Sequence, residues 1–216
     1  MSAGFTQQEI DTVYRVIQER RDVRHFVSGA VDDAVIARLL HAAHQAPSVG
    51  YMQPWRFIRI ASASVRSAII ELVEAERLNT AAALGERGAE FMRLKVEGIR
   101  ECGALFVVAL ADGREAHVFG RRTLPEMDLA SVACAIQNMW LASRAEGLGM
   151  GWVSLFDPKQ LAQLLAMPDG ARPVAVLCLG HVEQFYPRPM LEMEGWDTRR
   201  ELAQLVAVDR WSNTAG

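Results

Sequence analysis

The chain has 216 residues, half of them apolar, and a formal net charge of −3. A chain of this length seldom divides into two units, so we expect a single domain over residues 1–216. The charge lacks the basic excess typical of nucleic-acid binding, and no apolar run is long enough to span a membrane. The amino terminus has no secretory pattern and the three cysteines are scattered, which predicts a cytoplasmic protein with reduced thiols.

Two common kinds of site are disfavoured by the absence of their motifs. The five histidines form no HExxH and the cysteines form no CxxC pair, so we expect no protein-bound metal. No GxGxxG follows the first predicted strand, and no GxxxxGK[ST] occurs anywhere. A Rossmann or P-loop nucleotide site is therefore disfavoured.

The first half of the chain predicts helices followed by alternating strands and helices. Thr6-Gln7-Gln8-Glu9 has the spacing of a capping box and opens a first helix. Asp32 or Asp33 can cap a second helix. Further along, the pattern predicts a strand over 57–61, helices over 64–79 and 86–100, and a strand buried on both faces over 104–111.

The second half begins with the strongest helical pattern. It follows a capping-box spacing at Thr123-Leu124-Pro125-Glu126 and stops at Gly147. A strand over 150–154, a helix opened by Asp157-Pro158 and running through Leu165, and a buried strand over 172–180 come next. Residues from about 185 to 216 carry prolines and tryptophans and are typical of an arm, with packing on a partner subunit as one role for it.

Three clusters of residues could carry chemistry, and the first is Arg20-Arg21-Asp22-Val23-Arg24. Arginine offers a planar fork of donors that grips a phosphate, and several converging arginines add charge balance. The alternative is a solvated basic helix end, which the helix dipole also favours. The charge pattern alone gives the two alternatives about equal weight.

The second cluster is the loop Ala46–Trp55, in which two prolines, a glycine and a serine leave many backbone groups available. Ser48 and Gln53 could hydrogen-bond a polar heterocycle, although the loop taken alone favours an ordinary helix-to-strand connection with a core tryptophan. The third cluster is Glu146–Phe156, whose three glycines allow close approach to a ligand or to another element. Its alternative is a glycine-terminated helix that leads into a strand.

Together the clusters resemble the nitroreductase superfamily in order and spacing, over essentially the whole chain. The motifs are RRDVRHF, APSVGYMQPWRF and DLASVACAIQNMWLASRAEGLGMGWVSLF. Superfamily members usually carry RRSxRxF and SxxNxQPW, whereas here Asp22 replaces the serine and Gly50-Tyr51 replaces the asparagine. RRDVR, APSVGxMQPW, GxGWVS and the lid-like stretch Arg93–Arg100 are similar to the 5,6-dimethylbenzimidazole synthase branch.

The resemblance implies an α+β fold: a mixed, mostly antiparallel sheet flanked by helices, in an intertwined homodimer with FMN at the subunit interface. It implies a lid-like excursion over about 79–100 and a carboxy-terminal arm over about 185–216. It also implies a reaction in which reduced FMN is the substrate. With O2, the flavin is cut to 5,6-dimethylbenzimidazole, the lower ligand of cobalamin, and erythrose 4-phosphate is released. The reductant stays open between NAD(P)H used by the chain itself and a separate flavin reductase.

The resemblance further implies roles for individual residues. Asp22 is the candidate catalytic carboxylate, because flanking guanidiniums favour its ionised form and a base near the ribityl hydroxyls could move protons. The alternative is that Asp22 only pairs with those arginines. Ser154 is the second catalytic candidate, at the N5 edge of the flavin. The residues implied in FMN binding are Arg20, Arg21, Asp22, Val23, Arg24, Pro47, Ser48, Gln53, Ser154, Leu155 and Arg188.

Three other functions stay open on the same sequence. The first is an NAD(P)H-dependent nitroreductase or flavin reductase. The second is a reductive dehalogenase similar to iodotyrosine deiodinase, whose lid supplies Glu, Tyr and Lys; residues 79–100 include Lys95 but no tyrosine. The third is a non-catalytic FMN-binding protein. Reduced FMN exposed to air separates them, because reoxidation leaves a yellow flavin whereas fragmentation bleaches it.

Overall fold

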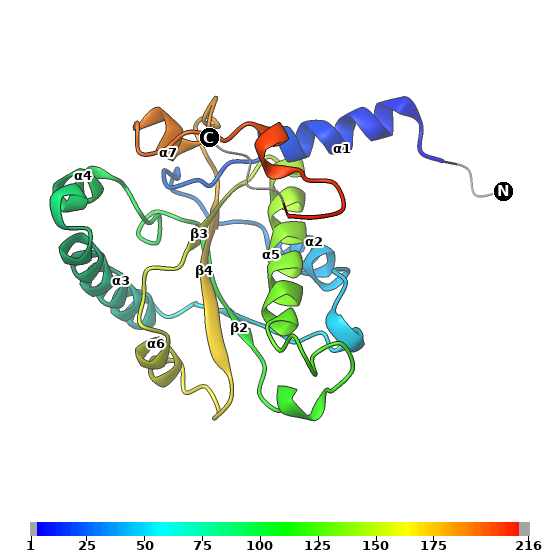
Figure 1. Cartoon of the computed structure of the whole chain (residues 1–216). Coiled ribbons are helices and arrows are strands. Elements are labelled where there is room, and N and C mark those ends of the chain that lie inside the picture. The colour runs from blue at the N-terminus through cyan, green and yellow to red at the C-terminus, as the bar shows by residue number, and fades with distance from the viewer. Residues whose placement is uncertain (1–3, 212–216) are drawn as a thin grey trace.

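The computed structural model describes residues 4–211, whose elements follow the predicted order (Figure 1). The helices are α1 (Gln7–Glu19), α2 (Asp33–His44), α3 (Ala63–Ala83), α4 (Gly88–Arg93), α5 (Met127–Ala145), α6 (Pro158–Leu164) and α7 (Met190–Met193). The strands are β1 (Trp55–Arg59), β2 (Ala104–Leu110), β3 (Gly149–Val153) and β4 (Arg172–Gly180).

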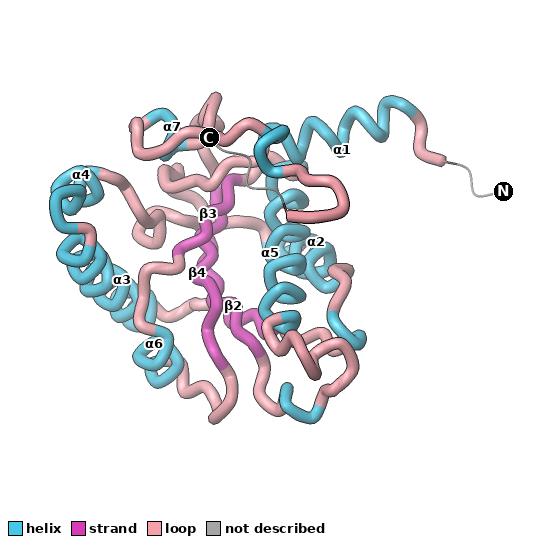
Figure 2. Tube along the Cα trace, in the orientation of Figure 1, coloured by secondary structure: helices cyan, strands magenta, loops and turns pink. Residues whose placement is uncertain are grey.

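The four strands form one sheet in the order β1-β2-β4-β3, with antiparallel neighbours throughout. An isolated parallel bridge between Asp22 and Met150, outside the four strands, lays the segment after α1 beside β3. Figure 2 shows the strands in the middle of the molecule, between helices. Because both faces are covered, β2 and most of β4 are continuous apolar runs, as their sequences predict.

Two hydrophobic cores lie on opposite faces of the sheet. Phe106 of β2 faces a core built with α2 and α5, and Leu105, its neighbour, faces a core built with α3 and α6. Successive side chains of a strand point to opposite faces, which explains the division. The result is a three-layer arrangement, with α2 and α5 on one side of the sheet and α3 and α6 on the other (Figure 1).

Several helix ends are where the sequence places them. The predicted capping box of α1 is confirmed: the Thr6 hydroxyl accepts from the backbone N–H of Glu9, and the Glu9 carboxylate accepts from that of Thr6. Asp32 caps α2, and Asp157 caps α6 with Pro158 in the first turn. These are local signals, so they need no tertiary information.

Other predicted features are wrong in detail. The capping box at Thr123 is not formed, because α5 begins after Glu126 without a side-chain cap. Asp128 accepts from the Leu129 N–H instead, while pairing with Arg114 and Arg121. The predicted strands over 57–61 and 150–154 begin earlier, at Trp55 and Gly149.

The predicted helix over 86–100 ends at Arg93. Leu94 is extended, and the backbone N–H of Ile99 bonds the Glu97 carboxylate instead of continuing a helix. Gly98 packs so tightly on the Phe26 ring that a Cβ would overlap it. Within residues 4–211 no helix is long and apolar enough to cross a membrane. The cytoplasmic location stays a prediction.

Candidate functional site

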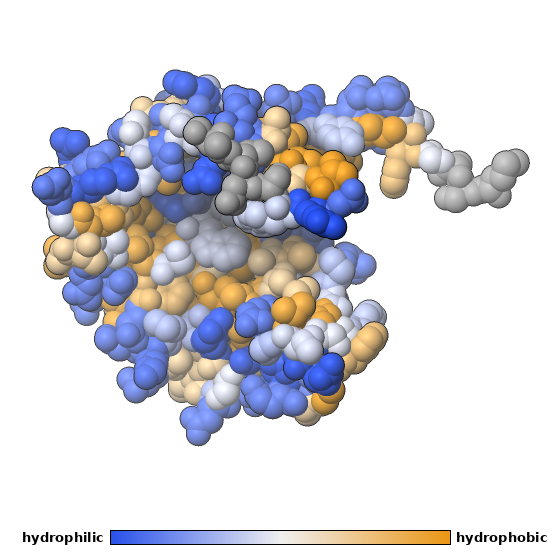
Figure 3. All heavy atoms as spheres, viewed as in Figure 1, coloured by the Kyte–Doolittle hydropathy of each residue, from blue (hydrophilic) through white to orange (hydrophobic). Residues whose placement is uncertain are grey.

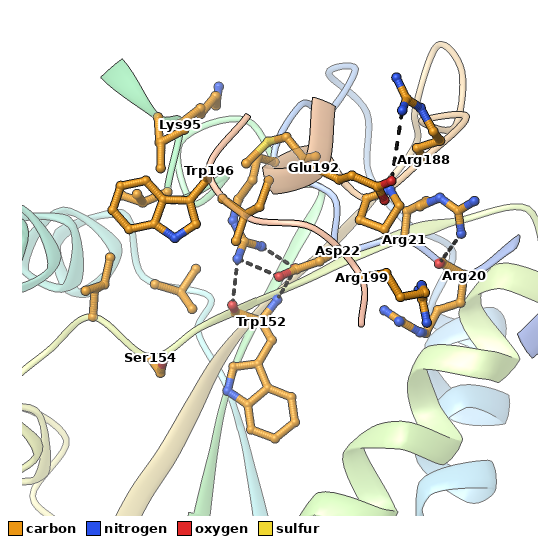
Figure 4. A pocket seen from close by; sticks show the side chains of 18 of the residues that line it. Arg20, Arg21, Asp22, Lys95, Trp152, Ser154, Arg188, Glu192, Trp196 and Arg199 are labelled. Atoms are coloured by element: carbon orange, nitrogen blue, oxygen red, sulfur yellow. Dashed lines mark hydrogen bonds and ion pairs between the residues drawn. The ribbon is translucent and has the colours of Figure 1, made fainter. Parts of the chain in front are cut away.

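A cleft of about 700 Å³ lies between the segment after α1, the end of β3, the α4 region and the carboxy-terminal arm (Figure 4). Figure 3 shows the viewed face of the molecule hollowed at its middle, with hydrophobic surface inside and mostly hydrophilic surface around it. The cleft brings together seven of the predicted site residues: Arg20, Arg21, Asp22, Arg24, Ser154, Leu155 and Arg188.

The glycine-rich segment (146–156) allows the segment after α1 to pack closely on β3 and so form one wall of this cleft. A Cβ on Gly151 would overlap the carbonyl oxygen of Val23, and one on Gly149 would crowd the Val23 side chain. The close approach is therefore to another element, one of the two predicted alternatives. It lets the Val23 N–H donate to the carbonyl of Met150 at 3.0 Å. Gly147, with a φ of +77°, ends α5, as predicted.

Asp22 is fixed on this wall with one acceptor position left over. Its Oδ1 accepts from Arg24 Nη1 and from the backbone N–H of Trp152 at 3.0 Å, and its Oδ2 accepts from Arg24 Nη2 at 2.8 Å. A carboxylate has about four lone-pair sites. The side chain is 43% exposed and lines the cleft. Asp22 therefore both pairs with Arg24 and retains an Oδ2 lone pair for a ligand.

The terminal nitrogens of Arg24 and Arg21 donate hydrogen bonds to other protein groups. The Arg24 side chain is 11% exposed, and its terminal nitrogens donate to Asp22 and to the carbonyl of Trp152 at 2.8 Å. Arg21 donates to the carbonyls of Gln18, Tyr186 and Pro187 at 2.7, 3.1 and 3.0 Å. Arg24 thus orients Asp22, and Arg21 ties the end of α1 to the start of the arm.

Among residues 4–211, Arg20 and Arg199 are the cleft arginines whose guanidiniums make neither a hydrogen bond nor an ion pair. Arg20 lies over the Trp140 ring, with Cζ 4.5 Å from its centroid. Burial lowers the pKa of Arg20 from its ordinary value; Asp22 opposes the shift, and the like charges of Arg21 and Arg199 add to it. A cluster of like charge that lowers its own pKa is suited to an anion.

Arg199 was missed by the sequence prediction, which chose Arg188. The structure places both in the cleft, but a guanidinium nitrogen of Arg188 lies 3.9 Å from the Glu192 carboxylate. Two consecutive arginines, Arg199 and Arg200, were the available signal. Figure 4 shows Arg199 beside Arg20, and Arg188 farther out beside Glu192.

Ser154 and Leu155 directly follow β3 and line the cleft. The Ser154 side chain is exposed and makes no hydrogen bond to the described residues. Its hydroxyl can both donate and accept, so it is available to a polar ligand atom.

Four predicted site residues do not line this cleft. Val23 is 1% exposed and belongs to the interior. Pro47, Ser48 and Gln53 lie in the loop before β1, where the Ser48 hydroxyl accepts from the Gln53 N–H at 3.0 Å. That loop is joined to α5 by a hydrogen bond from the Val49 N–H to the Ser131 hydroxyl. Within one chain, the loop therefore stays apart from the arginine cluster.

Comparisons with known proteins fit this geometry. The model of the Nitroreductase family matches residues 17–181. This chain belongs to the nitroreductase family. It is therefore an enzyme of the oxidoreductase class, and the predicted nitroreductase-like α+β fold is confirmed.

Within the family, two synthases are informative relatives. It is 42% identical to the 5,6-dimethylbenzimidazole synthase of Rhodospirillum rubrum, over 88% of this chain and 91% of that protein. It is 39% identical to a 5,6-dimethylbenzimidazole synthase of Rhodobacter capsulatus, over 89% and 94%. The predicted resemblance to this branch is confirmed.

Solved structures agree on the fold. Nitroreductase A of Vibrio parahaemolyticus superposes with a TM-score of 0.71 at 18% identity, over 93% of this chain and 77% of that one. Iodotyrosine deiodinase, solved with FMN and 3-iodo-L-tyrosine, superposes with a TM-score of 0.72 at 21% identity, over 92% of this chain and 100% of that one.

Proposed function

We propose that this chain is a 5,6-dimethylbenzimidazole synthase. With O2 it converts reduced FMN into 5,6-dimethylbenzimidazole, the lower ligand of cobalamin, and releases erythrose 4-phosphate. The observation that carries the proposal is Asp22: a carboxylate with a free acceptor position lines the cleft where the superfamily motif usually has serine. The identity of 42% to a named synthase, across nearly the whole chain, supports it.

The residues of the cleft fit FMN. Arg20 and Arg199 form a pair of guanidiniums without an ion-pair partner among residues 4–211, and such a pair can bind a phosphate monoester. Leu94, Leu155 and Trp196 add apolar walls for a flat ring system. The volume of about 700 Å³ lies within the range of about 300–1,000 Å³ that is usual for such ligands.

When bound, reduced FMN supplies both the electrons that activate O2 and the ring atoms of the product. The chain supplies position and proton transfer. Arg24 and the Trp152 N–H hold Asp22 by its inner lone pairs, so that the remaining Oδ2 position can take a proton from the ligand. The Ser154 hydroxyl offers a second donor in the same cleft.

The active form in this proposal is a homodimer. Helix α1 has no buried residue in the single chain, and it exposes Val13, Tyr14 and Ile17. The arm exposes Leu202 and Val208. Apolar faces of this kind mark interaction surfaces. A second copy would also bring its own Ser48–Gln53 loop to the cleft, which explains how predicted flavin contacts can lie apart within one chain. Size-exclusion chromatography with light scattering tests this: a monomeric mass at working concentration would contradict it.

The second candidate is an NAD(P)H-dependent nitroreductase or flavin reductase, favoured by the fold similarity to nitroreductase A. It would keep its flavin through turnover. Whether NAD(P)H reduces FMN on this chain or a separate flavin reductase does so needs its own test, in which oxidised FMN and NAD(P)H are mixed with this chain alone. The test of the synthase starts from reduced FMN. The experiment adds reduced FMN anaerobically and then admits air: a permanent loss of yellow colour supports the synthase, and full return of the colour contradicts it.

A further inference from the structure

Beside the cleft, the lid-like segment (about 79–100) meets the carboxy-terminal arm (about 185–216) through a contact between Arg87 and Trp196. The Arg87 guanidinium carbon lies 3.7 Å from the centroid of the Trp196 ring. Its Nη2 donates to the carbonyl of Trp196 at 3.0 Å, and its Nε donates to the Glu90 carboxylate at 3.0 Å. Phe91 approaches the same indole, with centroids 6.2 Å apart. Phe91 and Trp196 both line the cleft, and Figure 4 shows Trp196 above it.

Arg87 and Trp196 each belong to a segment that other contacts hold in place. Helix α4 sits tightly on α3, because a Cβ on Gly88 would overlap the carbonyl of Ala81, and Arg77 of α3 donates to the carbonyl of Leu94 at 3.3 Å. On the other side, the backbone N–H of Trp196 donates to the carbonyl of Leu191 at 2.8 Å, which ties the backbone at Trp196 to α7. The contact therefore joins two supported elements that lie far apart in the sequence.

We infer that Arg87 is a positioning residue: it clasps Trp196 and thereby holds the lid and the arm together over bound flavin. The inference rests on the proposed function in taking FMN as the ligand. In this proposal, flavin held between α4 and the arm leaves by parting them, so the strength of the contact between Arg87 and Trp196 enters the release rate. A reaction with many steps needs that retention, because a partly degraded ligand that escaped would be lost.

The clasp gives a measurable rate. Arg87→Met keeps an apolar stem but removes the cation above the indole and the hydrogen bond to Trp196. A cation–π contact and a charge-assisted hydrogen bond together predict a roughly tenfold faster release of oxidised FMN. Release is followed by flavin fluorescence after the loaded protein is mixed with an excess of an apoprotein that captures FMN. Arg87→Lys keeps the charge and should restore part of the retention.

Arg93→Met is the matched control. Arg93 lies at the end of the same helix, is exposed, and makes no hydrogen bond or ion pair with the described residues. The two variants lose the same charge, so a general electrostatic effect would change both release rates alike. Equal acceleration in the two variants, or none in Arg87→Met, overturns the clasp.

Hydrogen exchange of the flavin-free full chain provides a readout that needs no ligand. The clasp predicts faster amide exchange over residues 85–93 in Arg87→Met, with α3 unchanged. Unchanged exchange overturns the clasp, and faster exchange with unchanged FMN release overturns its role in retention. Failure of the unmodified protein to bind FMN would instead contradict the proposed function, while the exchange comparison would still decide whether Arg87 holds the lid.

Discussion

Replacing Asp22 with serine removes the carboxylate that distinguishes this cleft. Asp22 accepts hydrogen bonds from both terminal nitrogens of Arg24 and from the Trp152 N–H. A serine hydroxyl is too short to span the guanidinium fork, so Arg24, with its side chain 11% exposed, loses its counter-ion. The Trp152 N–H loses its acceptor as well.

The cost to stability is moderate. Removing one partner of a fully buried ion pair costs about 3–5 kcal/mol, and a hydrogen bond to a charged group is worth about 1.5–3 kcal/mol. The Asp22 side chain is 43% exposed, so solvent screens part of the interaction and water can replace some of the bonds. We expect the free energy of unfolding to fall by about 2 kcal/mol, which leaves a typical domain folded.

The cost to chemistry is larger. FMN binding should persist, because Arg20 and Arg199 are untouched, whereas 5,6-dimethylbenzimidazole formation should fall by a factor of at least about 100, the lower end for loss of a general acid or base. Urea unfolding, FMN titration and mass spectrometry of the product measure the three quantities. Asp22→Asn keeps the shape without the charge and should lose product to a similar extent. Undiminished product from Asp22→Ser would refute the proton-transfer role.

Three further variants test the frame around Asp22. Gly151→Ala should lower the free energy of unfolding by about 1–3 kcal/mol and reduce product, because its Cβ displaces Val23, and urea unfolding with product analysis shows both; normal values would contradict the seating of that wall. Arg199→Met should weaken FMN binding about tenfold and leave riboflavin binding almost unchanged in fluorescence titrations, while Arg188→Met should weaken FMN binding less. An equal loss of affinity for FMN and riboflavin in Arg199→Met would contradict a phosphate contact. Leu177→Ala, in the buried centre of β4, should cost about 2–5 kcal/mol in urea unfolding with FMN affinity retained.

Local signals predicted most of the fold. The Thr6 capping box, the Asp157-Pro158 helix start and the unbroken apolar runs of β2 and β4 depend only on neighbouring residues, and the structure confirms them. Tertiary contacts explain the failures. Helix α4 ends at Arg93, and Gly98 in the chain after it packs against the Phe26 ring; no periodicity over 86–100 reveals that contact.

The sequence predicted which residues line the candidate site better than it predicted what each of them contacts. The motifs placed Asp22 and Ser154 on one cleft. They did not reveal that the terminal nitrogens of Arg24 donate to Asp22, or that Arg199 lies beside Arg20. Both contacts depend on the tertiary structure. The glycines of residues 146–156 predicted a close approach either to a ligand or to another element, and only the position of Val23 against Gly149 and Gly151 decides for the second.

The most direct test of the central claim follows isotope-labelled flavin. Reduced FMN carrying ¹³C in the two methyl groups of its ring is mixed with the protein in air, and the small molecules are analysed by mass spectrometry. The account predicts labelled 5,6-dimethylbenzimidazole with matching disappearance of FMN, and loss of this product in Asp22→Ser. Quantitative recovery of intact labelled FMN would contradict it.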